Sequence, residues 1–194
     1  NTLCRRHNCL LIADEVQTGM GRCGTFFASE LTGLQPDMIT LAKPLAGGLP
    51  LSAVLIPEKI NSLLKPGHHA TTFGGGPVTT AVALAVWDIL SAPDFLEETQ
   101  RKGRLLEDLL AGALRKQNIA GEIRGAGLLR GLRLSGSSYD GAWCSKVLTA
   151  CRERGLILLK TEADVLRLAP PLVISSKEIK EGVEILSEVI YQNL

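Results

Sequence analysis

The chain has 194 residues, of which 45% are hydrophobic and 21% are charged, and its formal net charge is +1. This apolar content is enough for a substantial core and argues against a disordered chain. The near balance of 21 basic and 20 acidic residues gives no indication of a surface that binds nucleic acid or a membrane.

The cysteines and the N-terminal residues indicate the cellular compartment of the protein. Five cysteines are present, no two are spaced as C-x-x-C, and none forms a ligand pattern with the three histidines. We therefore predict no metal site, and reduced thiols in a cytoplasmic compartment. Residues 1–8 resemble the end of a helix and contain neither an initiator Met nor a signal peptide. We expect the chain to begin inside a longer protein, and the presence of an organellar targeting peptide upstream of residue 1 stays an open alternative.

The first half of the chain contains short apolar runs that predict strands. Residues 9–13 form one run, which ends at Asp14, and residues 38–41 form another, which ends just before Lys43. Continuous runs of this kind are typical of strands buried on both faces of a parallel sheet. Ligands of open α/β sheets bind outside the carboxyl ends of the strands, which is where both polar residues would lie. Residues 51–56 are a third candidate strand.

Prolines mark the helices that follow. Pro57 fits the first turn of a short helix, and Pro77 fits the first position of a helix that runs to about Leu90. The second of these is apolar nearly all round, so we expect it to be buried. After a break at Pro93, residues 95–116 predict a long amphipathic helix.

The sequence changes character near Gly121. The expected elements are a strand-like stretch at residues 123–134, a helix at 140–154 ended by Gly155, strands at 156–159 and 165–168, and a last helix that begins with the capping box of Ser175 and Glu178. The predicted fold class is α/β. Residues 1–92 would belong to a larger domain, and residues 93–194 would form a linking helix and a small α+β domain.

Asp14 and Lys43 are the residues whose type and position point to chemistry. Taken alone, Asp14 could be a helix cap or salt-bridge partner, and Lys43 could be a surface lysine at the start of a loop. A carboxylate at the end of a buried strand must be paired, however, and a lysine removed from water has a free amine that can form an imine. Together they are what a pyridoxal phosphate (PLP) site requires, since the carboxylate keeps the pyridine nitrogen protonated and the lysine supplies the imine.

Four segments, in order, resemble the motifs of class III (fold-type I) PLP-dependent aminotransferases. They are LIADEVQTGMGR at residues 11–22, PDMITLAK at 36–43 followed by GGLP at 47–50, HATTFGGGP at 69–77, and VLRLAPPL at 165–172. Acetylornithine and ornithine aminotransferases are the most similar members. The resemblance covers nearly the whole chain and implies the C-terminal half of such an enzyme, with part of the sheet of the large PLP-binding domain and the small domain.

The resemblance implies roles for residues around the cofactor ring. Asp14 would pair with the pyridinium nitrogen, and Val16 would pack on one face of the ring. Gln17 would form a hydrogen bond near the phenolic oxygen. Lys43 would be the Schiff-base lysine and would move the proton during catalysis. A core valine and a loop-stabilising amide are the structural alternatives for Val16 and Gln17.

Three further residues would act on the phosphate and the substrate. Thr72 would donate to the cofactor phosphate across the interface of a homodimer, and Thr71 would lie in the substrate pocket, although an ordinary turn would also explain both. Arg167 would bind a substrate carboxylate through its two-pronged guanidinium group, with a structural ion pair as the alternative.

The predicted function is PLP-dependent transamination between an amino donor of the N-acetylornithine or ornithine type and 2-oxoglutarate. In this family the N-terminal half carries the phosphate loop of the same subunit, the aromatic residue that stacks on the ring and a second substrate arginine, so we expect the isolated chain to be inactive. Two alternatives stay open. The chain could be a truncated, non-catalytic dimerisation remnant, or another class III member such as a 4-aminobutyrate-type or ω-aminotransferase or an aminomutase.

Overall fold

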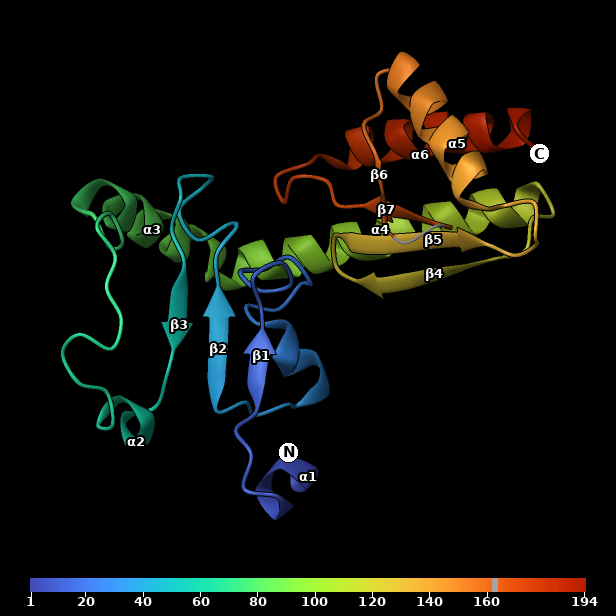
Figure 1. Ribbon diagram of the computed structural model, residues 1–194. Helices are drawn as coiled ribbons and strands as arrows, with labels where there is room; N and C mark the ends of the chain where they lie inside the picture. The colour runs from blue at the N-terminus through green and yellow to red at the C-terminus, as the bar shows by residue number, and fades with distance from the viewer. Residues whose placement is uncertain (162–163) are drawn as a thin grey trace. The chain divides into compact units, whose positions relative to one another are not determined.

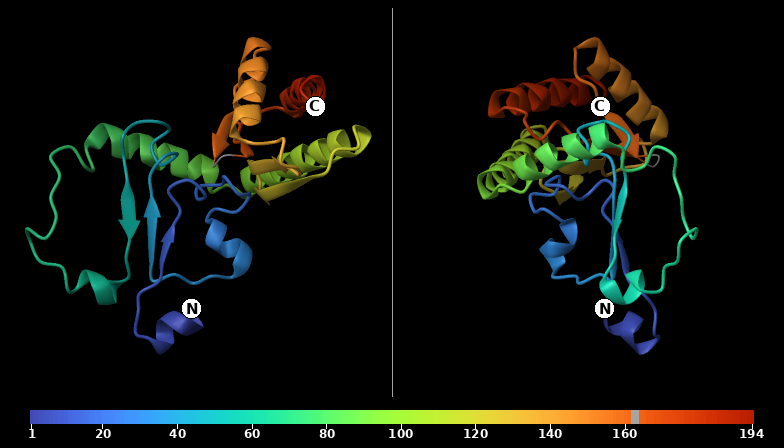
Figure 2. Two further views of the ribbon diagram at one scale, coloured as in Figure 1. Left: turned by 45° about the vertical axis from the view of Figure 1, so that its right-hand side comes forward. Right: turned by 90° about the vertical axis from the view of Figure 1, so that its left-hand side faces the viewer.

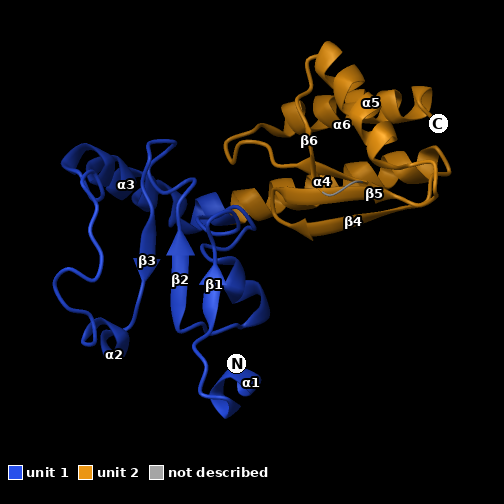
Figure 3. Ribbon diagram, in the orientation of Figure 1, with its two compact units in different colours: residues 1–96 blue, residues 97–194 orange. Residues whose placement is uncertain are grey.

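The computed structural model describes residues 1–161 and 164–194 (Figure 1). The chain divides into two compact units, Asn1–Leu96 and Glu97–Leu194 (Figure 3). Each unit has its own sheet, with strand order β1-β2-β3 in the first and β4-β5-β7-β6 in the second. The α/β fold class is confirmed. The division into domains after residue 92 stays a prediction, because compactness alone assigns neither unit a role.

Unit 1 is built on a three-stranded sheet. Its elements are α1 (Thr2–Arg6), β1 (Ile12–Asp14), the 3-10 helix η1 (Ala28–Thr32), β2 (Met38–Leu41), β3 (Ala53–Leu55), α2 (Glu58–Asn61), α3 (Pro77–Leu90) and the first residues of α4 (Pro93–Lys116). Strand β1 runs parallel to β2, whereas β3 runs antiparallel to it. The third candidate strand, predicted at residues 51–56, is thus present over Ala53–Leu55 and runs against its neighbour. The connection from β2 to β3 contains no helix, and a parallel strand would need a longer crossover, usually a helical one.

Much of the apolar surface of unit 1 is exposed, contrary to the prediction of strands buried on both faces and a buried α3. Ile12 of β1 is 53% exposed and Val54 of β3 is 54% exposed. On α3, Leu84 is 69% exposed and Leu90 alone is buried. The apolar sequence pattern shows that these strands and this helix have faces suited to burial. Burial also requires other side chains to pack against those faces, and the residues that the structure describes do not do so.

Unit 2 contains a continuous core. Its further elements are β4 (Gly121–Ala126), β5 (Leu129–Leu134), α5 (Gly141–Glu153), β6 (Leu159–Thr161), β7 (Val165–Leu168) and α6 (Ser176–Gln192). All strand pairs of its sheet are antiparallel. Helices α4, α5 and α6 all contribute buried residues, among them Leu110, Val147 and Leu186, and Figure 2 shows them grouped with the sheet from two further directions.

The predicted helix ends of unit 2 are confirmed. The side chain of Asp140 accepts hydrogen bonds from two backbone N–H groups of α5, and Ser175 and Glu178 form the capping box of α6. Gly155 follows α5 with a φ of 83°. The strand predicted at residues 156–159 begins later, because the N–H of Leu156 donates to the carbonyl of Cys151 (2.9 Å) and so belongs to the helix end.

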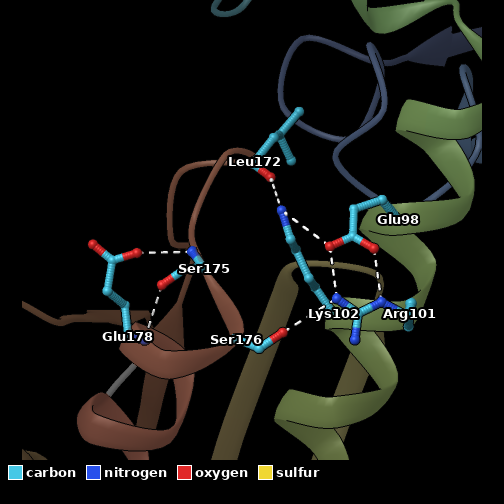
Figure 4. Close-up of polar contacts among 7 residues, drawn as sticks. All are labelled: Glu98, Arg101, Lys102, Leu172, Ser175, Ser176 and Glu178. Carbon is cyan, nitrogen blue, oxygen red and sulfur yellow. Dashed lines mark hydrogen bonds and ion pairs between the residues drawn. The ribbon is translucent and has the colours of Figure 1, made fainter.

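A cluster of charged residues joins α4 to the segment between β7 and α6 (Figure 4). Lys102 is 8% exposed, and its Nζ donates to the carbonyl of Leu172 (3.3 Å) and pairs with Glu98 (3.6 Å). Glu98 also binds Arg101 through two bonds of 2.7 Å, and Arg101 donates to the hydroxyl of Ser176 (3.2 Å). These bonds anchor both ends of the segment Leu172–Ser176, which follows the strand of Arg167.

Candidate active site

One parallel register brings the sequence-predicted residues of unit 1 together. Strands β1 and β2 pair residues that lie 26 positions apart, and Asp14 is the partner of Thr40. The same offset continues beyond the strand ends, where Gln17 meets Lys43. The carboxyl ends of the two strands thus carry the four side chains side by side, at the edge where ligands of open α/β sheets bind.

Asp14 presents one oxygen that is engaged and one that is free. Its Oδ1 accepts a hydrogen bond from the backbone N–H of Val16 (3.1 Å) and another from the hydroxyl of Thr40 (3.0 Å). Within the described ranges 1–161 and 164–194, no residue donates to Oδ2. The side chain is exposed, so the free oxygen is open to a ligand that carries an N–H group.

Lys43 lies directly after β2, and its Nζ donates to Oε1 of Gln17 (2.7 Å). Its side chain is exposed, which corrects the expectation of an amine removed from water at this position. The residues that the structure describes around Lys43 do not shield its amine from solvent. What the structure does provide is a fixed direction for the amine, toward the loop that follows Asp14.

That loop is held by Glu15, which sequence reasoning missed. The side chain is 2% exposed, and its two oxygens accept hydrogen bonds from the backbone N–H of Ser29 (2.7 Å) and the hydroxyl of Thr18 (2.6 Å). Its carbonyl accepts from the N–H of Gly19 (3.1 Å), and a Cβ added to Gly19 would lie 2.9 Å from that oxygen. The turn that carries Val16 and Gln17 is therefore tightly anchored. The signal in the sequence was the second carboxylate beside Asp14.

Thr71 and Thr72 lie in the exposed loop between α2 and α3. The hydroxyl of Thr71 accepts a hydrogen bond from the N–H of Gly74 (3.2 Å), as expected of a turn. No hydrogen bond joins Thr72 to another residue of the described part of the chain. The structure does not connect either threonine to Asp14 or Lys43, and their proposed roles stay predictions.

Arg167 lies on β7 of unit 2, opposite Gly131 and Leu159. It lines a largely apolar cavity of about 330 Å³ within this unit, whose other charged lining residue is Glu178. Its Nε is buried and has no hydrogen-bond partner among the described residues. An unpaired buried N–H of a cation is costly, so this group is suited to a ligand that brings an acceptor.

The donor set at the end of β1 and β2 fits pyridoxal phosphate. A free carboxylate oxygen matches the ring nitrogen, an amine matches the aldehyde, and an amide lies beside that amine. A metal would need a different set, and residues 1–161 and 164–194 contain no cluster of three His, Cys, Asp or Glu side chains able to hold one.

Over the same ranges, no single helix is long and apolar enough to cross a membrane. Only α3 and α4 taken together, as a bent pair, reach the required length and hydropathy.

Comparison with known proteins extends these observations. The family model described as aminotransferase class III matches residues 1–190. The chain is 43% identical over 190 residues to an acetylornithine/succinyldiaminopimelate aminotransferase of Photorhabdus laumondii, covering 98% of this chain and 47% of that protein. It is 44% identical over 190 residues to a succinylornithine transaminase of Yersinia pseudotuberculosis, covering 98% and 45%.

Solved structures of aminotransferases are also similar to this chain. An acetylornithine aminotransferase from Elizabethkingia anophelis matches with a TM-score of 0.87 at 36% identity, covering 98% of this chain and 48% of that one. A Bacillus anthracis aminotransferase matches with a TM-score of 0.91 at 34% identity, covering 98% and 46%. The chain thus spans about half the length of the relatives it matches. With the family model matching nearly every residue, the chain belongs to the class III aminotransferases.

Proposed function

We propose that residues 1–194 supply the lysine half of the active site of a PLP-dependent aminotransferase. One observation carries the proposal: a single strand register presents the free Oδ2 of Asp14 and the Lys43–Gln17 pair at the same edge of the sheet. A surface lysine and a helix-capping aspartate would not need to lie at the same sheet edge. They would also not need the buried carboxylate of Glu15, which fixes the turn that follows Asp14.

When bound, PLP supplies an aldehyde that condenses with amines and a protonated pyridine ring that withdraws electrons. Asp14 would accept the ring N–H at Oδ2 and so keep the ring charged. Val16 would pack on a face of the ring, and Gln17 would bind near its phenolic oxygen. The amine of Lys43 would hold the cofactor at its aldehyde carbon, and its Nζ would also be the group that carries a proton during the reaction.

Arg167 would bind a carboxylate of the substrate, which its unpaired Nε supports. Thr71 would line the substrate pocket. Thr72 would donate to the cofactor phosphate of the other subunit in a homodimer, since its hydroxyl is exposed and unengaged by the described residues.

The proposed substrates are an amino donor of the N-acetylornithine or ornithine type and 2-oxoglutarate as the acceptor, in cytoplasmic arginine biosynthesis. The names of the relatives support this choice, because they specify acetylornithine, succinylornithine and succinyldiaminopimelate. A panel of amino donors would distinguish this assignment from a 4-aminobutyrate-type or ω-aminotransferase, and from an aminomutase, which needs no 2-oxo acid.

The test is covalent labelling. The protein that carries this chain, expressed with any flanking sequence its gene encodes, is incubated with PLP and reduced with borohydride, and its peptides are mapped by mass spectrometry. We expect a pyridoxyl label on Lys43 and a visible absorption band before reduction. The Lys43→Ala variant should lose both, while Lys59→Ala, which removes an exposed lysine paired with Asp37 instead, should keep both.

The competing interpretation is a non-catalytic dimerisation remnant, which the exposed apolar residues of β1, β3 and α3 favour. A wild-type protein that forms dimers but acquires no label on Lys43 would support the remnant and refute the proposed function. A label that survives the Lys43→Ala substitution would refute the assignment of Lys43.

A further inference from the structure

Thr40 lies in the segment at residues 36–43, where the resemblance assigns a role to Lys43 but none to this threonine, yet its hydroxyl contacts the carboxylate of Asp14. We propose that Thr40 is a positioning residue for Asp14, whose hydroxyl holds the carboxylate so that one oxygen is presented to the ring nitrogen of PLP. The inference rests on the function proposed above and names a residue that tunes cofactor binding at that site.

The contact follows from the strand register. Asp14 and Thr40 are direct partners in the parallel pair of β1 and β2, so their side chains leave the sheet on the same face. The hydroxyl of Thr40 donates to Oδ1 of Asp14 (3.0 Å), and the carbonyl of Thr40 accepts the N–H of Glu15 (3.0 Å). Because a β-branched side chain has restricted χ1 rotamers, Thr40 offers its hydroxyl in a well-defined direction.

The two donors to Asp14 act on the same oxygen. Thr40 from β2 and the N–H of Val16 from the following loop both bind Oδ1, and they approach from different parts of the chain. The N–H of Val16 alone would let the carboxylate turn about its Cβ–Cγ bond, and the second donor restricts the directions in which the two oxygens can point. With both donors in place, Oδ1 is engaged and Oδ2 is left as the acceptor for a ligand. Hydrogen bonds to an ionised group are stronger than neutral ones, which makes the hydroxyl effective in this role.

A purely structural role for Thr40 would have a different signature. A hydroxyl that only stabilises the sheet edge would affect every ligand of the site to the same degree. A hydroxyl that acts through Asp14 affects only ligands that have a ring nitrogen for Asp14 to bind. The distinguishing probe is therefore an analogue of PLP in which the ring nitrogen is replaced by C–H.

The experiment compares the dissociation constants of PLP and this analogue for wild type, Thr40→Val and Thr40→Ser, all in the protein with its flanking sequence. Valine has nearly the shape of threonine without the donor, and serine keeps the donor. We expect Thr40→Val to weaken PLP binding about tenfold, as the loss of a hydrogen bond to a charged group implies. The dissociation constant of the analogue should change by less than about twofold. Thr40→Ser keeps the donor without the β-branch, so it should bind PLP more tightly than Thr40→Val.

A matched control is Thr149→Val in unit 2, which removes a hydroxyl that donates to a helix carbonyl (3.1 Å) and should leave both affinities unchanged. If Thr40→Val does not fold, as judged by its thermal unfolding, Thr40→Ala removes the same donor. Equal weakening of both ligands, or no weakening of PLP, would overturn the role of Thr40 alone. A wild type that binds no PLP and acquires no label on Lys43 would overturn the proposed function as well.

Discussion

Unit 1 and unit 2 differ in how far their helices and strands bury apolar side chains. In unit 2, three helices and the sheet bury a continuous core, and the N-termini of α5 and α6 are capped by side chains. In unit 1, β1, β3 and α3 expose large apolar side chains, and neither α2 nor α3 has a side-chain cap. The difference teaches that stability and the proposed chemistry belong to different parts of this chain, because unit 2 has its own core and unit 1 has the polar sheet edge with Asp14 and Lys43.

The largest expected effect is on the free energy of unfolding of the 194-residue chain. Two Leu→Ala substitutions inside helices, one in each unit, test the contrast directly. Leu110 of α4 is 3% exposed and Leu84 of α3 is 69% exposed. We expect Leu110→Ala to lower the free energy of unfolding by about 2–5 kcal/mol, because it removes buried methyl groups and leaves a cavity. Leu84→Ala should cost less than about 1 kcal/mol. Urea denaturation measures both, and equal costs would mean that the apolar face of α3 is covered in solution.

The second effect is a loss of stability of unit 2 in alkali. Burial raises the pKa of the Cys151 thiol from an ordinary value of 9.0 to about 11. The folded state therefore keeps its proton where the unfolded state loses it. The contribution is fully present below pH 9 and is lost as the pH rises toward 11, by about 2–3 kcal/mol.

Denaturation at a series of pH values between 8 and 11 measures this loss, and Cys151→Ala is the comparison. The variant should show a shallower decline, although it retains Cys144, whose pKa burial also raises. Identical declines in the two proteins would contradict the prediction.

A third effect concerns packing around α4, where two glycines form a matched pair. A Cβ added to Gly103 would lie 2.5 Å from the carbonyl oxygen of Gly127, whereas one added to Gly112 would meet nothing within 4 Å. Gly103→Ala should destabilise unit 2 by about 1–3 kcal/mol through overpacking. Gly112→Ala should stabilise it by about 1 kcal/mol through helix propensity. Thermal unfolding would show shifts of opposite sign, and shifts of the same sign would refute the close approach.

The smallest effect concerns the cap of α6. Ser175→Ala removes the acceptor for the N–H of Glu178 (3.2 Å) and should cost about 1 kcal/mol. The hydroxyl and N–H of Ser175 also hold the pKa of Glu178 below its usual value. This stabilisation is present above the usual glutamate range and is lost as the pH falls through the lowered pKa, so the variant should lose less stability in acid than wild type. Denaturation at pH 7 and pH 3 measures both, and a variant as acid-sensitive as wild type would contradict this linkage.

Much of the fold and site was predictable from local signals. The first position of α3 at Pro77, the capping box at Ser175, the helix end at Gly155 and the strand Val165–Leu168 were all predicted correctly, since each depends on residues close in the sequence. Asp14 and Lys43, the residues of the proposed site, stand out in the sequence because each comes at the end of an apolar run. The burial of α3 was predicted wrongly, and the direction of β3 was not predicted, since both depend on what lies beside an element in space.

The sequence by itself determined the family, because motifs of contiguous residues carry that information, and the same motifs predicted the residues of the proposed site. Only the tertiary structure decided how Asp14 is held. The offset of 26 residues between β1 and β2 sets which side chains become neighbours, and no local pattern states it. That register gave Asp14 the hydroxyl of Thr40 and gave Lys43 the amide of Gln17, and it left one carboxylate oxygen free.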